Sequence, residues 1–349
     1  MSNCILNTVA QQSLYESAAK PWRLSIAPML DVSDRHARFF YRLLAPKALL
    51  YTEMVTTGAL VYGDVARHLQ FNQEEHPVAL QLGGSERTDL VHSAKLGAAW
   101  GYDEINLNCG CPSERVQKGA FGACLMAESE LVADCLKAMQ DAVSIPVTVK
   151  HRLGLDYSED YGFVRDFVGT LIQKSATRVF IVHARNAVLK GLSPKDNRDI
   201  PPLRYQWVAQ LKQDFPEARF ILNGGLSEVA QMFEQAQRFE GIMVGRAAWH
   251  EPYRIGEISR LLWPDIDHPD TDSLIQSMYD YAVRQHAAGV PLRFVFKPLL
   301  GLFNGQKGAK LWRRTLSDAS LLKKADPNLL LKTYAEFKKH SSFFCSNLN

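Results

Sequence analysis

Eight short apolar segments, each followed by polar or glycine-rich residues and then by a helix-like stretch, recur along the first 250 residues. Their hydrophobic character is nearly continuous rather than alternating, which is typical of parallel strands that are covered on both faces. Eight strand–helix units in a stretch of this length match a (β/α)8 TIM barrel. We therefore predict an α/β fold with strands at Leu24–Leu30, Ala48–Val55, Pro77–Leu82, Glu104–Asn108, Pro146–Lys150, Arg178–His183, Arg219–Leu222 and Gly241–Val244.

Helix-start signals between the strands support this reading. Ser33-Asp34 precedes an aromatic run, and Ser227-Glu228 precedes an apolar periodic segment, as N-cap residues do. A doubly wound sheet usually has fewer strands, and no G-x-G-x-x-G motif follows the first strand here.

The pattern changes after Trp263-Pro264. Two prolines and four aspartates fill positions 264–272, which is typical of a linker, and Asp272 or Ser273 is the expected helix cap. Only helical periodicity follows, including a helix start at Asp326-Pro327. We predict an N-terminal extension at 1–20, a barrel at 21–263 and a C-terminal helical domain at 271–349.

The net charge of +3 is unevenly distributed along the chain. From Thr271 onward there are 12 Lys and Arg against 5 Asp and Glu, a net charge of +7, whereas the first 270 residues carry −4. A basic appendage on a mildly acidic body predicts either a polyanionic partner or a well-solvated helical surface.

Other compositional features exclude several classes of protein. No apolar run approaches the 18 or so residues of a membrane span, so we expect no membrane association. The first twenty residues resemble neither a secretory signal nor a transit peptide, which favours the cytoplasm. Six cysteines without a C-x-x-C pair predict reduced thiols and no metal site.

Polar groups occupy nearly every predicted strand end, where barrel enzymes carry their chemistry. Gly224-Gly225 and Gly245-Arg246 follow the last two strands, and phosphate sites of such barrels are frequently built there from loop amides and helix starts. We therefore expect a ligand with a phosphate group.

Lys150 closes the fifth strand and Gln81 lies at the end of the third, so both side chains can meet that ligand. A cation, an amide and a phosphate cradle suit flavin mononucleotide (FMN), whose reduced ring carries negative charge at N1–O2. A phosphosugar or pyridoxal phosphate fits the phosphate loops equally well, and Lys150 would then form a Schiff base with the pyridoxal group.

Cys111 lies in a turn directly after the fourth strand, between Gly110 and Pro112. A thiol in a loop of the catalytic face can act as an acid or a nucleophile. Cys109 is two residues earlier, so a redox pair is an alternative, whereas the C-x-C spacing without a second cluster disfavours a metal.

Short motifs recur at the predicted strand ends, from about Arg23 to the C-terminal helices. They are Asn106-Leu107-Asn108-Cys109-Gly110-Cys111-Pro112-Ser113 with Arg115-Val116 and Gly119, Ala27-Pro28-Met29, Gln81-Leu82, Val149-Lys150-His151-Arg152, Val182-His183-Ala184-Arg185, Asn223-Gly224-Gly225 and Met243-Val244-Gly245-Arg246. As a set, these motifs resemble those of the tRNA-dihydrouridine synthases. Leu300-Gly301-Leu302-Phe303, Gly308 and Trp312-Arg313-Arg314 resemble the A-type subfamily.

The resemblance implies an FMN barrel that uses NADPH to reduce tRNA uridines to dihydrouridine, at positions 20 and 20a of the D-loop for the A-type. It makes Cys111 the proton donor and Asn108 the neighbour of the target base. Position 109 is commonly apolar in the family, so Cys109 is a departure that keeps a redox role open. The implied FMN-binding residues are Pro28, Met29, Leu30, Gln81, Lys150, His183, Asn223, Gly224, Gly225, Gly245 and Arg246.

Basic residues at two places are candidate tRNA contacts, together with Arg152. Lys195 and Arg198 follow the sixth strand, after a Gly-Leu-Ser-Pro turn that leaves them exposed. We expect Trp312 to pack inward and its neighbours to face solvent. The candidates in the helical domain are Lys310, Arg313 and Arg314.

Two alternatives stay open at the level of sequence. A flavin oxidoreductase of the dihydroorotate dehydrogenase type explains the barrel and the cysteine but leaves the basic tail without a purpose. A non-catalytic RNA-binding barrel protein leaves the ring of polar strand ends unexplained. The preference between NADPH and NADH, the role of the N-terminal extension and the oligomeric state are open, and no obligate protein partner is evident.

Overall fold

The computed structural model describes residues 21–113, 119–324 and 326–342 of the 349-residue chain. The predicted extension at 1–20 and the motif residues Arg115 and Val116 lie outside the described residues.

Eight parallel strands close into a barrel in the order β1 to β8, so the predicted TIM-barrel fold is confirmed. Each strand pairs with its sequence neighbours, and β1 pairs with β8 to close the ring. The strands are β1 Leu24–Ile26, β2 Leu49–Thr56, β3 Val78–Gly83, β4 Glu104–Cys109, β5 Val147–His151, β6 Val179–His183, β7 Arg219–Asn223 and β8 Gly241–Val244.

Strand β1 ends four residues earlier than the sequence indicates. Ala27 still donates its N–H to the Val244 carbonyl, at an N···O distance of 2.9 Å, but Pro28 has no N–H with which to continue the ladder. The segment Ala27–Leu30 is therefore a loop at the carboxyl end of the strand.

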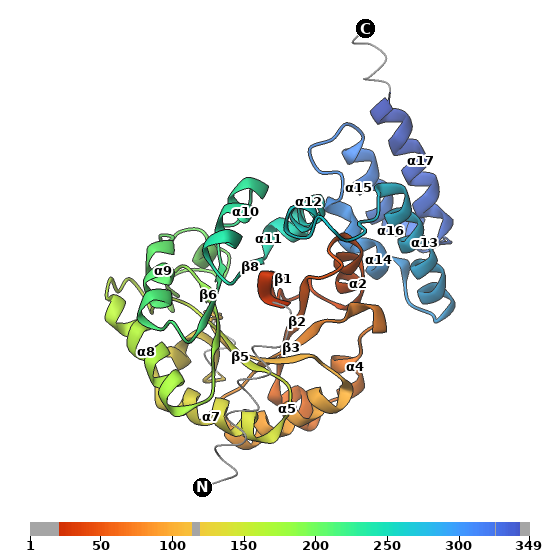
Figure 1. Ribbon diagram of the computed structural model, residues 1–349. Helices are drawn as coiled ribbons and strands as arrows, with labels where there is room; N and C mark the ends of the chain where they lie inside the picture. Colours follow the sequence, from red (N-terminus) through yellow and green to blue (C-terminus); the bar gives the residue numbers. More distant parts are fainter. Residues whose placement is uncertain (1–20, 114–118, 325, 343–349) are drawn as a thin grey trace. The chain divides into compact units, whose positions relative to one another are not determined.

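The chain divides into two compact units, and the first contains Met1–Leu30 and Ala48–Gly245. Figure 1 shows α5, α7, α8 and α9 outside its ring of strands. Its core includes Trp22, Tyr51 and Ile181, all nearly inaccessible to solvent. Its helices are α3 Thr57–Tyr62, α4 Val65–Leu69, α5 Arg87–Trp100, α7 Ser129–Ala142, α8 Tyr161–Lys174, α9 Tyr205–Asp214 and α10 Val229–Arg238, with 3₁₀ turns η1 Pro21–Arg23, η2 Gln73–Glu75, η3 Gly122–Ala127 and η4 Asp196–Arg198.

The second unit contains Asp31–Lys47 and Arg246–Asn349, and its described secondary structure is helical. Phe303 and Phe337 stack at 3.9 Å between ring centroids beside the buried Trp312. The predicted domain boundaries 21–263 and 271–349 stay a prediction. The elements are α2 Arg35–Leu44, α11 Arg246–His250, α12 Tyr253–Leu262, α13 Thr271–Ala287, α14 Leu292–Phe296, η5 Lys297–Gly301, α15 Ala309–Ser317, α16 Ala319–Leu322 and α17 Asn328–Ser342.

Two of the predicted helix starts agree with the structure in position, and the predicted cap of α13 does not. Asp34 caps α2 as expected and accepts two backbone N–H groups. Helix α13 begins at Thr271 and is capped by Asp270, which accepts the Ser273 N–H, rather than by Asp272 or Ser273; the Asp272 side chain accepts the Tyr334 hydroxyl. Helix α10 begins at Val229, directly after Ser227-Glu228 as expected, but its N-cap residue Glu228 makes no side-chain cap bond, and the Gln231 side chain accepts the Ser227 N–H at 3.4 Å.

None of the helices in the described ranges combines the length and the apolar character needed to cross a bilayer.

Candidate active site

A chain of five hydrogen-bonded side chains runs through the barrel interior, and we refer to it as the polar chain. It starts at Glu104 on β4, whose carboxylate accepts the Thr148 hydroxyl at 2.6 Å. Asn106 donates to Thr148 at 2.8 Å and accepts from Gln81 at 2.8 Å. Gln81 in turn accepts from Asn108 at 2.9 Å. All five side chains are at most 8% exposed, so these bonds form away from bulk water.

Cys111 lies where the polar chain meets the loop after β4. The Asn108 side-chain oxygen accepts the backbone N–H groups of Gly110 and Cys111, both at 3.1 Å. The Cys111 thiol is partly exposed and lies 3.6 Å from the Ser113 hydroxyl. Cys109 is fully buried, and burial raises the pKa of its thiol well above the ordinary value. Cys111 is therefore the thiol of this pair that a substrate can reach.

Lys150 is next to Asn108 across the β4–β5 pair. The pKa of its ammonium is lowered to about 7, chiefly by burial and also by the charge of the nearby Arg152, while Cys111 opposes the shift. Within the described residues Lys150 makes no hydrogen bond or ion pair, so its ammonium is available to an electron-rich ligand. A bound anion would raise the pKa of Lys150 again.

The turn after β7 is shaped by two glycines with left-handed backbone conformations, Gly224 at φ +102° and Gly225 at φ +69°. A Cβ atom at Gly224 would lie 2.3 Å from the His183 ring, and one at Gly225 would lie 2.4 Å from Leu203. The Tyr205 hydroxyl donates to the Gly224 carbonyl at 2.6 Å and fixes the turn. Only glycine permits this close approach, and glycine turns of this kind can present backbone N–H groups to a phosphate.

The glycine turn and the polar strand ends together fit a flavin that carries a phosphate group. Gln81, Lys150 and His183 come from three different strand ends of the same barrel unit, and amide, ammonium and imidazole groups can each hydrogen-bond a flavin ring. Asn223 at the end of β7 is buried and donates to the Met243 carbonyl at 2.7 Å.

Arg152 is 3% exposed, although the sequence suggested a contact with tRNA. Its guanidinium donates to the carbonyls of Gly110 at 3.2 Å, Asn186 at 3.0 Å and Asn197 at 2.9 Å. Arg152 thus ties the Cys111 loop to the loops after β5 and β6. A contact with tRNA would require the guanidinium to leave these carbonyls.

The other predicted residues lie as follows. Met29 packs against the core and Leu30 is 69% exposed, while Gly245 approaches Ala27 and Met29. Residues on the loop after β6 and on α15 and α11 are exposed: Lys195, Arg198, Lys310, Arg313, Arg314 and Arg246. Arg246 opens α11 and is counted with the second unit. Trp312 is buried as expected and donates its indole N–H to the Leu299 carbonyl at 2.8 Å.

Sequence reasoning did not identify Glu104 or Thr148, which complete the polar chain. Both are polar residues inside apolar strands, and that interruption is the signal that could have identified them. Burial raises the pKa of Glu104 to about 7, although hydrogen bonds from Thr148, Tyr51 and Trp22 oppose the shift.

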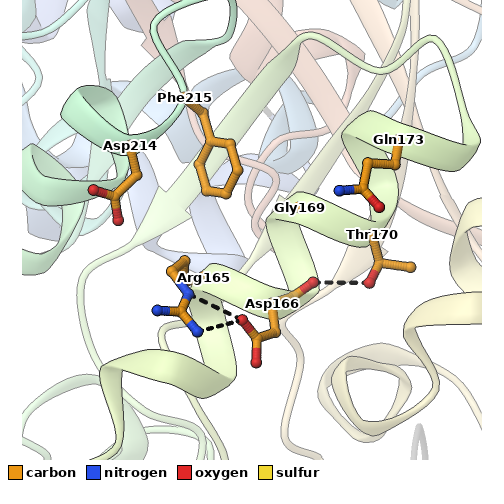
Figure 2. A pocket seen from close by; sticks show the side chains of 7 residues that line it. All are labelled: Arg165, Asp166, Gly169, Thr170, Gln173, Asp214 and Phe215. Carbon is orange, nitrogen blue, oxygen red and sulfur yellow. Dashed lines mark hydrogen bonds and ion pairs between the residues drawn. The ribbon is translucent and has the colours of Figure 1, made fainter.

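A separate cavity of about 570 Å³ lies on the outside of the barrel between α8 and the end of α9 (Figure 2). Arg165 pairs with Asp166 at its edge, and Phe215 forms part of its wall. None of the predicted site residues lines this cavity.

A closed parallel barrel with cysteine, lysine, histidine and glycine turns at the carboxyl ends of its strands defines a (β/α)8-barrel enzyme. A family model described as dihydrouridine synthase (Dus) matches residues 25–339. The chain therefore belongs to the dihydrouridine synthase family.

Individual relatives agree with this assignment. A tRNA-dihydrouridine(20/20a) synthase of Salmonella typhi is 50% identical over 322 residues, which are 92% of this chain and 96% of that protein. Proteins of the same name from Pseudomonas syringae pv. tomato and Escherichia coli K12 are also 50% identical; they cover 90% and 88% of this chain, and 94% and 89% of their own lengths. Among solved structures, a 2-naphthoyl-CoA reductase complex aligns with a TM-score of 0.51 at 10% identity, over 69% of this chain and 50% of that one. That last likeness shows the fold alone.

Proposed function

We propose that this protein reduces uridine to 5,6-dihydrouridine in the D-loop of tRNA, at positions 20 and 20a, with FMN as its cofactor and NADPH as its reductant. The observation that carries the proposal is the Cys111 loop, which the Asn108 side chain holds at the end of β4 beside Lys150. Membership of the family and the names of the 50% identical relatives support the substrate and the positions. We expect the enzyme to work in the cytoplasm.

The cofactor would occupy the carboxyl end of the barrel. The glycine turn at Gly224 and Gly225 would bind its phosphate, with Gly245 and Arg246 after β8. Gln81, Lys150 and His183 would bind the ring. When bound, FMN would supply the hydride that goes to C6 of the uracil.

Cys111 would supply the proton that completes the reduction at C5. A general acid needs a thiol that is protonated, accessible and fixed in direction. The Cys111 thiol is partly exposed, and the backbone N–H and carbonyl of Cys111 are hydrogen-bonded to Asn108 and Ala123, whereas Cys109 is inaccessible. Asn108 would flank the target base, because its side chain lies between Gln81 and the Cys111 loop.

The uridine must turn out of its stack to reach a barrel interior, as bases do in other enzymes that modify them. Exposed Lys195 and Arg198 on the loop after β6 would contact the phosphates near that base. Lys310, Arg313 and Arg314 would hold the tRNA backbone elsewhere.

Replacement of the two cysteines tests the proposal. Cys111→Ala should keep its flavin absorbance and lose about 100-fold or more of its uridine reduction, whereas Cys109→Ala should stay within about threefold of the wild type, since a buried thiol with a small replacement costs only packing. Activity is measured by the reoxidation of reduced flavin on addition of tRNA and by dihydrouridine mapping of the product. A colourless protein that binds tRNA would instead favour the non-catalytic RNA-binding alternative. A flavoprotein that oxidises dihydroorotate, and does not reduce uridine in tRNA, would favour the alternative of the dihydroorotate dehydrogenase type.

A further inference from the structure

The polar chain ends in groups of fixed polarity on both sides. At one end the backbone N–H groups of Gly110 and Cys111 can only donate, and Asn108 must therefore present its oxygen to them. At the other end the Glu104 carboxyl group accepts the Thr148 hydroxyl at 2.6 Å. It is held there by the Trp22 indole N–H and the Tyr51 hydroxyl, each at 2.6 Å.

These ends determine the orientation of every amide between them. Thr148 gives its single proton to Glu104, so it can only accept from Asn106, which must present its NH2 group. The Asn106 oxygen then faces the Gln81 NH2 group, and the Gln81 oxygen faces the Asn108 NH2 group. The hydrogen-bond directions traced from Glu104 and those traced from the Cys111 loop therefore give the same orientation of the Asn108 amide.

We propose that Thr148 and Glu104 are positioning residues for Cys111, because they set the amide orientation through which Asn108 holds the Cys111 loop. The inference rests on the proposed function for its catalytic meaning, whereas the effect on the loop backbone is independent of it. A reversed chain would turn the Asn108 NH2 group toward two backbone N–H groups and release the loop.

The matched pair Thr148→Val and Thr148→Ser tests this chain. Valine keeps the shape of threonine but has no hydroxyl, so Asn106 loses its acceptor, whereas serine keeps the hydroxyl. On the purified protein, hydrogen exchange of the Gly110 and Cys111 amides should speed up about five- to thirtyfold in Thr148→Val and stay unchanged in Thr148→Ser. The kcat for uridine reduction should fall by a similar factor in the valine variant, with the tRNA KM unchanged.

Glu104→Gln carries the test if Thr148→Val fails to fold. A glutamine has a single oxygen for two sides of the site. When that oxygen faces the Trp22 N–H, the NH2 group faces Thr148 and reverses the chain. Adding Trp22→Phe removes the competing donor, so the double variant should regain slow amide exchange and most of the lost kcat.

Wild-type exchange rates and kcat in folded Thr148→Val would overturn the inference, as would a double variant no better than Glu104→Gln. Failure of the proposed function looks different. In that case the wild-type protein reduces no uridine, yet the exchange rates of Gly110 and Cys111 still respond to Thr148→Val.

Discussion

Gly224 offers a direct test of how the turn after β7 is built. Replacement by alanine forces a Cβ atom to within 2.3 Å of the His183 ring, at a backbone φ of +102°. Backbone strain of this kind costs about 1–2 kcal/mol. Displacement of a packed ring adds about 1–3 kcal/mol, by analogy with overpacked cores. We therefore expect Gly224→Ala to lower the free energy of unfolding by about 2–5 kcal/mol.

Gly191 provides the matched control. It has a similar left-handed φ of +85°, but a Cβ atom there would have no neighbour within 4 Å. Gly191→Ala should therefore show the backbone strain alone, about 1–2 kcal/mol. The difference between the two variants isolates the cost of moving His183.

Chemical denaturation of each flavin-free variant gives its free energy of unfolding. Titration of the folded, flavin-free variant with FMN gives its FMN affinity. If His183 contacts the ring of FMN, its displacement should weaken FMN binding by about three- to tenfold in Gly224→Ala and not in Gly191→Ala. Equal stability losses and equal FMN affinities in the two variants would refute the placement of His183 against both the turn and the cofactor.

Three further predictions follow from the charges. The pKa of Glu104 is raised to about 7 by burial, so between about pH 4.5 and pH 7 the unfolded chain loses this proton while the folded protein keeps it, and rising pH destabilises the wild type. Between pH 5 and pH 8 the free energy of unfolding should therefore fall by about 2–3 kcal/mol more in the wild type than in Glu104→Gln, and a constant difference between the two would contradict this. The groups that face this carboxyl are Trp22, Tyr51, Thr148 and, by charge, Asp103. Arg246→Ala should raise the FMN dissociation constant about tenfold or more in equilibrium dialysis, and unchanged binding would place the phosphate elsewhere. Replacing Arg313 and Arg314 by alanine should raise the tRNA KM and reduce the slope of log KM against log salt concentration by about 0.9 per lost phosphate contact. NADPH oxidation with an artificial electron acceptor should stay unchanged, and an unchanged salt slope would show that these arginines only form a solvated surface.

The strands could be predicted from the sequence because short, continuous apolar segments between helix-like stretches are typical of parallel strands that are covered on both faces. Seven of the eight predicted strands begin within one residue of the observed ones and end within one, and Leu24–Leu30 begins correctly. The strand-end residues Gln81, Lys150 and His183 followed from that register. The orientation of each amide did not, because it depends on hydrogen bonds between strands that are far apart in sequence, such as that of Glu104 with Thr148.

Arg152 shows the same limit. A strand-end arginine on a basic motif suggests an exposed cation, and nothing in the local sequence indicates that three carbonyls from two other loops surround it. Burial of an arginine becomes favourable only when such acceptors are supplied together, which is a property of the folded barrel.

All four backbone polar groups of Gly110 and Cys111, in the loop of the proposed proton donor, are hydrogen-bonded. The N–H groups of Gly110 and Cys111 donate to Asn108, the Gly110 carbonyl accepts from Arg152, and the Cys111 carbonyl accepts from the Ala123 N–H at 2.9 Å. A glycine in a loop normally adds conformational freedom, and these bonds remove it. The remaining freedom of Cys111 is rotation about its own side chain. Bonds within the barrel unit therefore fix the backbone of Cys111, and a site for catalysis requires supporting bonds of this kind.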